Sequence, residues 1–186
     1  MKADAAACCD EQHLVRQLRR GERAALEQLV AMYRPMVSRL VARLSGWSGE
    51  ADDLVQDVFV KAISAAGKFR GESKISTWLT SIAINVCRQH HRTRMFRAEF
   101  WKRWKGRPER MDADASQTLE RRERIERVTQ AVRRLRGNYR EVVVLHYLEG
   151  MSSEEIGGVL GVTRNTVEVR LHRAREQLRG MLGSIE

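Results

Sequence analysis

The chain has 186 residues, of which 42% are hydrophobic, 31% are charged and only two, Pro35 and Pro108, are proline. Such a composition fits a soluble, mostly helical protein with one domain or two small ones. No apolar run approaches the roughly 18–20 residues that cross a bilayer, and the first residues contain no apolar segment long enough for a secretory signal. We therefore expect a cytoplasmic protein without direct membrane insertion.

The net charge of +10 and the pI near 10.2 indicate a polyanionic partner. Lys and Arg side chains gain affinity for nucleic acids because they release counterions from the phosphates. The net charge alone does not establish a nucleic-acid partner, since a soluble protein with a merely basic surface would have the same composition.

The three cysteines, Cys8, Cys9 and Cys87, do not form a disulfide framework. Cys8 and Cys9, with His13 nearby, leave a metal site open, but the sequence has no C-x-x-C motif and no second pair of ligands. We expect no metal ion and no cofactor. Cys87 lies on the apolar side of a predicted helix, where we expect core packing.

Apolar residues recur at helical spacing almost throughout, and no segment alternates as a β-strand would, so the sequence predicts an all-α fold. A short helix around residues 14–18 is interrupted by Gly21. A long helix follows over residues 26–44, and its apolar period continues across Pro35, which predicts a kink there rather than an end. Two glycines then indicate a turn, namely Gly46 and Gly49.

A second long helix is predicted from about residue 50 to residue 66. Six of its residues are expected to face inward: Leu54, Val55, Val58, Phe59, Ala62 and Ile63. The loop KFRGES, residues 68–73, follows this helix. Ser73 or Ser76 is then expected to cap a further helix, whose apolar stripe is Ile75, Trp78, Leu79, Ile82, Ala83 and Val86.

The pattern changes after about residue 94. Residues 96–118 combine Gly, Pro and mixed charge without a long apolar stripe, which predicts a basic linker that is helical at most in part. Four aromatic residues of this linker could dock on a partner, follow a groove or pack on the nearest helix: Phe96, Phe100, Trp101 and Trp104. Helical spacing resumes at Leu119. We therefore predict two small helical domains, residues 1–95 and 119–186, joined by a flexible linker over residues 96–118.

Residues 150–176, GMSSEEIGGVLGVTRNTVEVRLHRARE, predict a helix-turn-helix motif in the second domain. Ser152 and Glu155 form a capping box at the start of the first helix. Gly157 lies where crossing helices leave no space for a larger side chain, Gly161 allows the turn, and Thr163 caps the second helix. The second helix then buries an apolar stripe of Val167, Leu171, Ala174 and Leu178.

The face of the second helix opposite this stripe carries the side chains expected to contact DNA. It consists of Asn165, Val169, His172, Arg173 and Glu176, with Arg164 and Thr166 at its N-terminal end and Arg170 and Arg175 beside the stripe. In a helix-turn-helix, the first residues of the second helix contact base edges and flanking cations hold phosphates. The alternative is a charged amphipathic helix whose outer face is only solvated.

Two blocks of the sequence resemble one protein family, the bacterial sigma factors of the extracytoplasmic-function class. The family's C-terminal promoter-binding domain is similar to residues 139–178, YREVVVLHYLEGMSSEEIGGVLGVTRNTVEVRLHRAREQL. Its N-terminal core resembles residues 52–92, DDLVQDVFVKAISAAGKFRGESKISTWLTSIAINVCRQHHR. The resemblance implies a sigma factor that binds core RNA polymerase, at its clamp and flap, and directs promoter-specific transcription initiation.

The segment DDLVQDVF resembles the part of the family that docks on the clamp helices of the polymerase. The resemblance implies that the outward residues bind there, namely Asp52, Asp53, Gln56 and Asp57. Favourable charge at the start of a helix is an alternative explanation for Asp52 and Asp53. It explains Asp57 less well.

The loop KFRGES and the helix after it resemble the segment that melts the downstream (−10) promoter element. Phe69 and its loop would help hold a base extruded from the non-template strand, and Asn85 would bond a base or the backbone there. The residues implied to contact this element are Lys68, Phe69, Arg70, Ser73, Asn85, Arg88, His91 and Arg92. Trp78 matches a family tryptophan too, but its place in the apolar stripe favours core packing.

The second helix of the motif is implied to contact the upstream (−35) promoter element. With the outward face described above, the expected contacts are Arg164, Asn165, Thr166, Glu168, Val169, His172, Arg173 and Arg175. Glu168 departs from the basic or polar residue of many relatives, and it would either accept a hydrogen bond from cytosine or repel phosphate. Arg136 and Gly137 stand where a proline commonly follows the leucine, which alters a helix start.

The family also implies control by an anti-sigma factor that clamps between the two domains and is often membrane-anchored. Two other classes of protein stay open. A conventional helix-turn-helix regulator would bind duplex DNA alone and would not need the base-capture loop or the acidic docking face. An enzyme is not expected, because the five histidines show no H-E-x-x-H motif or triad spacing and no phosphate-binding glycine loop is present.

Overall fold

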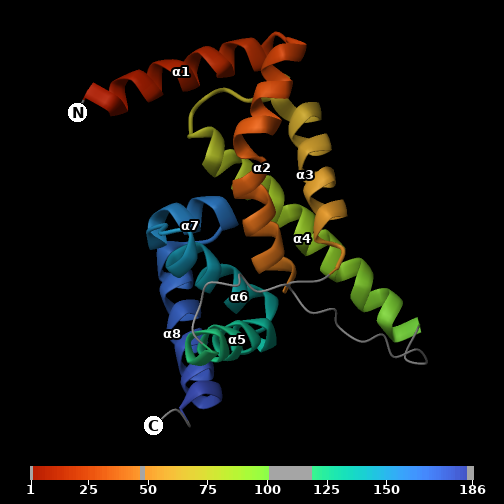
Figure 1. Ribbon diagram of the computed structural model, residues 1–186, viewed down its shortest axis with the longest axis vertical. Helices are drawn as coiled ribbons and strands as arrows, with labels where there is room; N and C mark the ends of the chain where they lie inside the picture. The colour runs from red at the N-terminus through yellow and green to blue at the C-terminus, as the bar shows by residue number, and fades with distance from the viewer. Residues whose placement is uncertain (1, 47–48, 101–118, 184–186) are drawn as a thin grey trace. The chain divides into compact units, whose positions relative to one another are not determined.

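The computed structural model describes residues 2–46, 49–100 and 119–183, and within these ranges it describes the side chains of residues 11–93 and of residues 123–183. The described residues form helices and no β-strand, which confirms the all-α prediction. Figure 1 shows the helices, which pack as two units: Met1–Val41 with Glu50–His90, and Ala42–Gly49 with His91–Glu186. None of the described helices is long and apolar enough to cross a membrane.

The first unit is built from α1 (Lys2–Arg19), most of α2 (Arg23–Ser45), α3 (Ala51–Ala65), the short 3-10 helix η1 (Ala66–Lys68) and the first part of α4 (Ile75–Phe100). Gly21 separates α1 from α2 with a φ of 70°, and α2 continues through Pro35. Both features are as the sequence predicts. α1 begins well before the predicted short helix, and α4 continues beyond residue 95 into the predicted linker.

A continuous set of aliphatic side chains forms the core of the first unit. Its largest fully buried members are Leu18, Leu29, Val37, Leu40, Val41, Val58, Ile75, Leu79 and Ile84. Cys87 is also buried, which confirms its predicted core position. Ile63 was expected to face inward, and this prediction was wrong, since its side chain is 42% exposed. Ile63 follows Gln56 by two helical turns, so it lies on the outer face of α3.

The second unit contains α5 (Leu119–Arg134), α6 (Gly137–Val143), a π-helical turn η2 (Val144–Leu148), α7 (Ser153–Leu160) and α8 (Arg164–Leu182). α8 packs against α5, α6 and α7, and the shared core includes Leu135, Val142, Leu145, Ile156, Val167, Leu171 and Ala174. α6 begins at Gly137, and Arg136 before it makes no side-chain cap hydrogen bond. The wider π-helical turn leaves Tyr147 and Leu148 exposed.

Arg140 of α6 is a buried cation whose guanidinium lies at the end of α5. Its Nε donates to the carbonyl oxygen of Val132 (3.3 Å), and its Nη2 donates to the carbonyls of Arg133 (2.6 Å) and Leu135 (3.1 Å). The last carbonyls of a helix lack intrahelical partners, and a cation satisfies them with favourable charge. Burial, followed by the nearby charge of Arg133, lowers the pKa of the Arg140 guanidinium. Arg140 therefore fixes the α5–α6 junction that supports the helix-turn-helix.

Candidate nucleic-acid interface

The helix-turn-helix is set up by hydrogen bonds at the start of each of its helices. Ser152 Oγ accepts from the backbone N–H of Glu155 (3.2 Å), and Glu155 Oε2 accepts from the backbone N–H of Ser152 (2.8 Å). Gly161 ends α7 with a φ of 67°, in the left-handed region that favours glycine. Thr163 Oγ1 then accepts from the backbone N–H of Thr166 (3.2 Å) and caps α8. The predicted capping box, the turn at Gly161 and the Thr163 cap are therefore confirmed.

Gly157 brings α7 and the turn into close contact. A Cβ at this position would lie 2.8 Å from the backbone carbonyl oxygen of Val162, which a larger residue could relieve only by moving the backbone. A Cβ at the adjacent Gly158 would meet no atom of the described residues within 4 Å. The prediction that Gly157 is required for close packing is therefore confirmed, although the nearest obstacle is the turn backbone rather than a helix.

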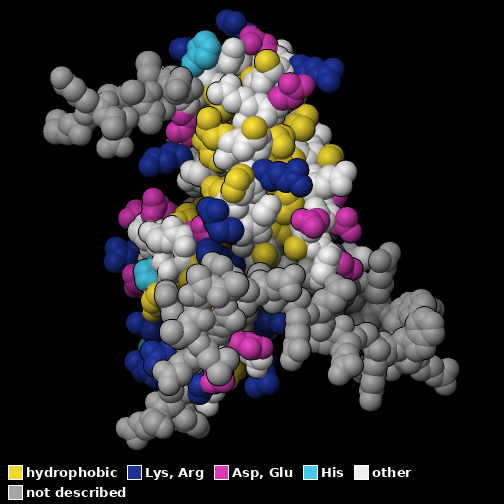
Figure 2. Space-filling view, viewed as in Figure 1, with side chains coloured by type: hydrophobic (Ala, Val, Ile, Leu, Met, Phe, Trp, Pro, Cys, Tyr) yellow, Lys and Arg dark blue, Asp and Glu magenta, His cyan; other side chains and the backbone are white. Residues whose placement is uncertain are grey.

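The outer face of α8 presents polar and basic side chains around one apolar residue. Val169 is 53% exposed, Asn165, His172 and Arg173 are exposed around it, and Arg175 is exposed beside the buried stripe. The opposite stripe buries Val167, Leu171 and Ala174, while Leu178 is half-buried. Figure 2 shows Lys and Arg side chains, in dark blue, along α8 with fewer acidic side chains between them. This face therefore has the chemistry for contacts with both bases and phosphates.

Intrahelical ion pairs organise the charges on this face. Arg164 Nε donates to Glu168 Oε1 at 2.7 Å, and this hydrogen bond and charge raise the pKa of the exposed Arg164 guanidinium. Glu176 accepts from Arg173 Nη1 at 3.0 Å, and its other carboxylate oxygen lies 3.5 Å from His172 Nε2. Thr166 is half-buried, with its hydroxyl 2.8 Å from that of Thr163. Arg164 thus compensates the charge of Glu168, a pairing that the sequence analysis did not anticipate.

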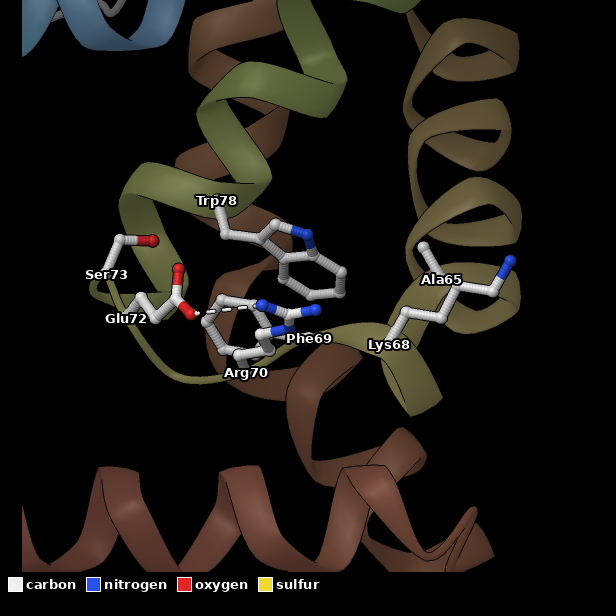
Figure 3. A pocket seen from close by; sticks show the side chains of 7 residues that line it. All are labelled: Ala65, Lys68, Phe69, Arg70, Glu72, Ser73 and Trp78. Atoms are coloured by element: carbon white, nitrogen blue, oxygen red, sulfur yellow. Dashed lines mark ion pairs between the residues drawn. The ribbon is translucent and has the colours of Figure 1, made fainter.

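A shallow hollow of about 360 Å³ lies at the loop between α3 and α4. Its wall is a pair of stacked rings, those of Phe69 and Trp78, whose centroids are 4.5 Å apart with 19° between the ring planes (Figure 3). Phe69 is only 7% exposed, whereas Trp78 is half-buried. Trp78 is therefore neither a wholly buried core residue nor a free aromatic surface.

Polar side chains surround this aromatic wall. Those of Lys68, Arg70, Glu72 and Ser73 are exposed and line the hollow together with Ala65. Arg70 Nη1 lies 3.7 Å from Glu72 Oε1, an ion pair drawn in Figure 3. The hollow thus combines a flat apolar wall with hydrogen-bond donors and acceptors, which is what binding of an unstacked base requires. Its volume falls near the lower end of the roughly 300–1,000 Å³ of small-molecule sites.

Three of the predicted −10 contacts continue from the hollow along α4. Asn85 is exposed two turns after Trp78 on the same face, followed by the half-buried Arg88 and the exposed Arg92. His91 points about 140° away from Trp78 around the helix. Its Nε2 lies 3.3 Å from the backbone carbonyl oxygen of Leu44. The structure therefore aligns Asn85, Arg88 and Arg92 with the hollow but separates His91 from them.

Asp52, Asp53, Gln56 and Asp57 are all exposed on α3, opposite its buried stripe. Two apolar residues continue the same face toward the end of the helix: Val60, which is 56% exposed, and Ile63. The sequence analysis missed this apolar part because it placed Ile63 in the core. The outer face of α3, residues 52–63, is thus acidic in its first half, while its second half carries the apolar Val60 and Ile63 and the exposed Lys61.

The first turn of α4 is held by a residue that sequence reasoning did not single out. Ser73 or Ser76 was expected to cap this helix. Instead, Glu11 Oε1 of α1 accepts from the backbone N–H of Ile75 at 2.5 Å. The expectation failed because the capping carboxylate comes from a different helix.

Residues 29–97 match sigma-70 region 2, and residues 125–178 match sigma-70 region 4. The RNA polymerase sigma-H factor of Pseudomonas aeruginosa is 34% identical over 176 residues, which cover 90% of this chain and 91% of that protein. The chain belongs to the sigma factors. SigM of Mycobacterium tuberculosis, a sigma factor of the extracytoplasmic-function class, is 32% identical over 88% of this chain and 80% of its own, which identifies the class.

Solved structures of similar chains have the same fold. CnrH, in complex with the cytosolic domain of CnrY, superposes with a TM-score of 0.68 at 29% identity and covers 95% of this sigma factor and 99% of its own chain. The sigma factor RpoE of Bartonella quintana, in complex with the anti-sigma factor NepR, has a TM-score of 0.72 at 23% identity over 86% of this chain and 98% of its own. The region 2 match includes the hollow and the outer face of α3, and the region 4 match includes the helix-turn-helix.

Proposed function

We propose that this sigma factor gives core RNA polymerase two contacts with promoter DNA, one in each helical domain, residues 1–95 and 119–186. The observation that supports this most strongly is that one chain carries both an aromatic hollow suited to a single extruded base and a helix-turn-helix with an exposed recognition face. A protein that only bound duplex DNA would have no use for the hollow.

The acidic and apolar face of α3 is proposed to bind the clamp of the polymerase. Asp52, Asp53, Gln56 and Asp57 supply charge and hydrogen-bond acceptors for a basic partner surface, while Val60 and Ile63 supply apolar area. Exposed apolar side chains beside charged ones are typical of protein interfaces, in which a hydrophobic centre has a polar rim. The second domain would contact the polymerase flap.

The hollow is proposed to take one base of the non-template strand when the −10 element opens. The base would stack beside Phe69 and Trp78 and bond to polar groups around them, among them Lys68, Arg70 and Ser73. Asn85 would contact the next base or its backbone, and Arg88 and Arg92 would hold phosphates along α4. Binding energy of this kind drives strand separation because it is gained only when a base has left the stack.

α8 is proposed to recognise the −35 element as duplex in the major groove. The exposed Asn165, Val169 and Arg173 would contact base edges, and Arg164 and Arg175 would hold phosphates. Thr166, Glu168 and His172 complete the expected contact set. Since each DNA contact is weak alone, promoter selection would require both at the spacing that the polymerase imposes, with residues 96–118 passing between them.

An anti-sigma factor is the proposed regulator, and whether it is membrane-anchored is open to experiment. Both solved relatives described above are complexes with a second protein, and one of those partners is named an anti-sigma factor. We assign no catalytic step to the chain itself, since the polymerase supplies the chemistry. We propose that it acts in the cytoplasm, where the polymerase and the promoter DNA are.

Run-off transcription tests this function. Core RNA polymerase is supplied with the DNA upstream of this protein's own gene, with and without the protein. Transcripts from a defined start that require both core and protein are the expected result. Absence of transcripts, together with tight binding of the protein alone to the duplex, would instead support a conventional helix-turn-helix regulator.

A further inference from the structure

α1 is tied to the start of α4 by a hydrogen bond between residues 64 positions apart in the sequence. Glu11 Oε1 accepts from the backbone N–H of Ile75 at 2.5 Å, and the Ile75 side chain is fully buried. The first backbone N–H groups of a helix have no partner within the helix. A carboxylate at this position is stabilised both by the hydrogen bond and by the positive end of the helix dipole.

α1 also lies beside the middle of the loop that precedes α4. Gly71 has a φ of +75°, and a Cβ built on it would lie 3.2 Å from Val15 Cγ1. Val15 follows Glu11 by one helical turn, so the two residues share a face of α1. The helix itself is anchored by the buried Leu14 and Leu18 and packs against η1, just before the loop.

The Glu11 hydrogen bond and the Val15 side chain both adjoin the residues that shape the hollow. Trp78 lies in the first turn of α4, where its backbone N–H donates to the Lys74 carbonyl at 3.1 Å, and its ring stacks on Phe69 at the other end of the loop. We infer that Glu11 and Val15 of α1 are positioning residues for the base-capture hollow, acting through Ile75 and Gly71. The inference rests on the proposed function of the hollow. A site that already has its binding geometry before the ligand arrives loses less binding free energy to the ordering of its side chains and loop.

The test uses full-length protein assembled with core polymerase on the DNA upstream of its own gene. Glu11→Ala removes the acceptor, Glu11→Gln keeps an oxygen that accepts, and Gln12→Ala alters the exposed neighbour on α1 as a matched control. The first measurement is the affinity of the unopened complex. The second is the rate of strand opening, followed by permanganate reactivity of unpaired thymines.

We expect Glu11→Ala to slow opening by about 10-fold, the scale of one charge-assisted hydrogen bond, with unchanged affinity of the unopened complex. Glu11→Gln is expected to recover part of the rate, and Gln12→Ala to match the wild type. Folded Glu11→Ala protein that opens DNA at the wild-type rate would overturn the inference. So would a Gln variant as slow as the Ala variant, because the acceptor oxygen would then be irrelevant.

Thermal unfolding of each variant shows whether Glu11→Ala is folded at the assay temperature. If the Glu11→Ala protein is not folded, Val15→Ala tests the inference instead. This substitution removes the methyl groups that lie beside Gly71 and leaves the Glu11 hydrogen bond in place. Slower opening by this variant supports the inference, and a wild-type rate overturns it. Failure of the proposed function is distinguishable, because the wild-type protein itself would then not open the promoter with core polymerase.

Discussion

Phe69 and Trp78 stack with their ring centroids 4.5 Å apart, and the stack joins the beginning of the α3–α4 loop to the first turn of α4. The sequence left two roles open for Trp78, core packing or contact with DNA. The stack accounts for both, because one side of the indole packs on the buried Phe69 while the half-buried ring still lines the hollow. The same two residues therefore hold the loop against the first turn of α4 and form the aromatic wall of the hollow.

Replacement of Trp78 should impair promoter opening more than promoter binding. Stacking of a base on an aromatic side chain contributes about 1–3 kcal/mol, which Trp78→Ala would remove and Trp78→Phe would largely keep. We expect fewer open complexes with Trp78→Ala at equal occupancy of the promoter, and a smaller loss with Trp78→Phe. Potassium permanganate footprinting beside a gel-shift assay measures both quantities. Equal activity of the two variants would argue against an aromatic contact with the base.

The two adjacent glycines of α7 should respond in opposite directions to the same substitution. Gly157→Ala places a Cβ against the Val162 carbonyl and should destabilise the helix-turn-helix by about 1–3 kcal/mol, the usual cost of overpacking. Gly158→Ala enters open space on the same helix and should stabilise it by up to about 1 kcal/mol. Urea unfolding followed by circular dichroism compares the two. Similar shifts of both midpoints would contradict the close contact at Gly157.

Glu168→Ala should strengthen DNA binding through charge rather than alter base preference. The substitution removes a negative charge and releases Arg164 from its 2.7 Å ion pair, so that the Arg164 guanidinium interacts with phosphate without competition from the Glu168 carboxylate. The affinity of the holoenzyme for −35 duplexes should then depend more strongly on salt. A plot of the logarithm of the binding constant against the logarithm of the salt concentration should be steeper by roughly one. Glu123→Ala, which removes one negative charge from α5 and breaks the looser 3.9 Å pair with Arg127, is the control. A changed preference at one base pair without a change in slope would instead place Glu168 against a base.

The apolar end of the outer face of α3 should contribute to polymerase affinity. Val60→Ser and Ile63→Ser each remove a half-exposed aliphatic side chain, and burial of such area is worth about 1 kcal/mol, so core binding should weaken by about fivefold per substitution. Met32→Ser, at 54% exposure nearly equal to the 56% of Val60, is the control on α2. Fluorescence titration of labelled protein with core polymerase measures the affinities. Loss of affinity with Met32→Ser alone would place the interface elsewhere.

Local chemistry explains which features were predictable from the sequence. The capping box at Ser152 and Glu155 and the turn at Gly161 depend on residues within a few positions of one another, and each has few alternative explanations. The exposed face of α8 follows in the same way from the helical period. The start and end of α7, the start of α8 and the side chains exposed on the outer face of α8 could therefore be predicted.

The features that sequence reasoning missed depend on contacts between distant residues, or on small differences in the direction in which a helical side chain points. Glu11 caps α4 from another helix, and nothing near Ile75 in the sequence indicates it. Ile63 continues the helical spacing of the apolar residues, but at the end of α3 its side chain is exposed to solvent. The hollow itself was predictable only as a loop that contains Phe69, since the stack with Trp78 arises from the tertiary fold.

The central claim is that opening and upstream recognition are divided between the two helical domains, and the comparison of Asn85→Ala with Arg173→Ala tests it most directly. Both are exposed substitutions, and both holoenzymes are assayed for initial promoter binding and for the rate of opening, on templates with an intact or a scrambled −35 element. We predict that Asn85→Ala slows opening while binding still depends on the −35 element. Arg173→Ala should reduce that dependence and leave opening of bound promoter unchanged. Equal loss of both steps in both variants would contradict the account.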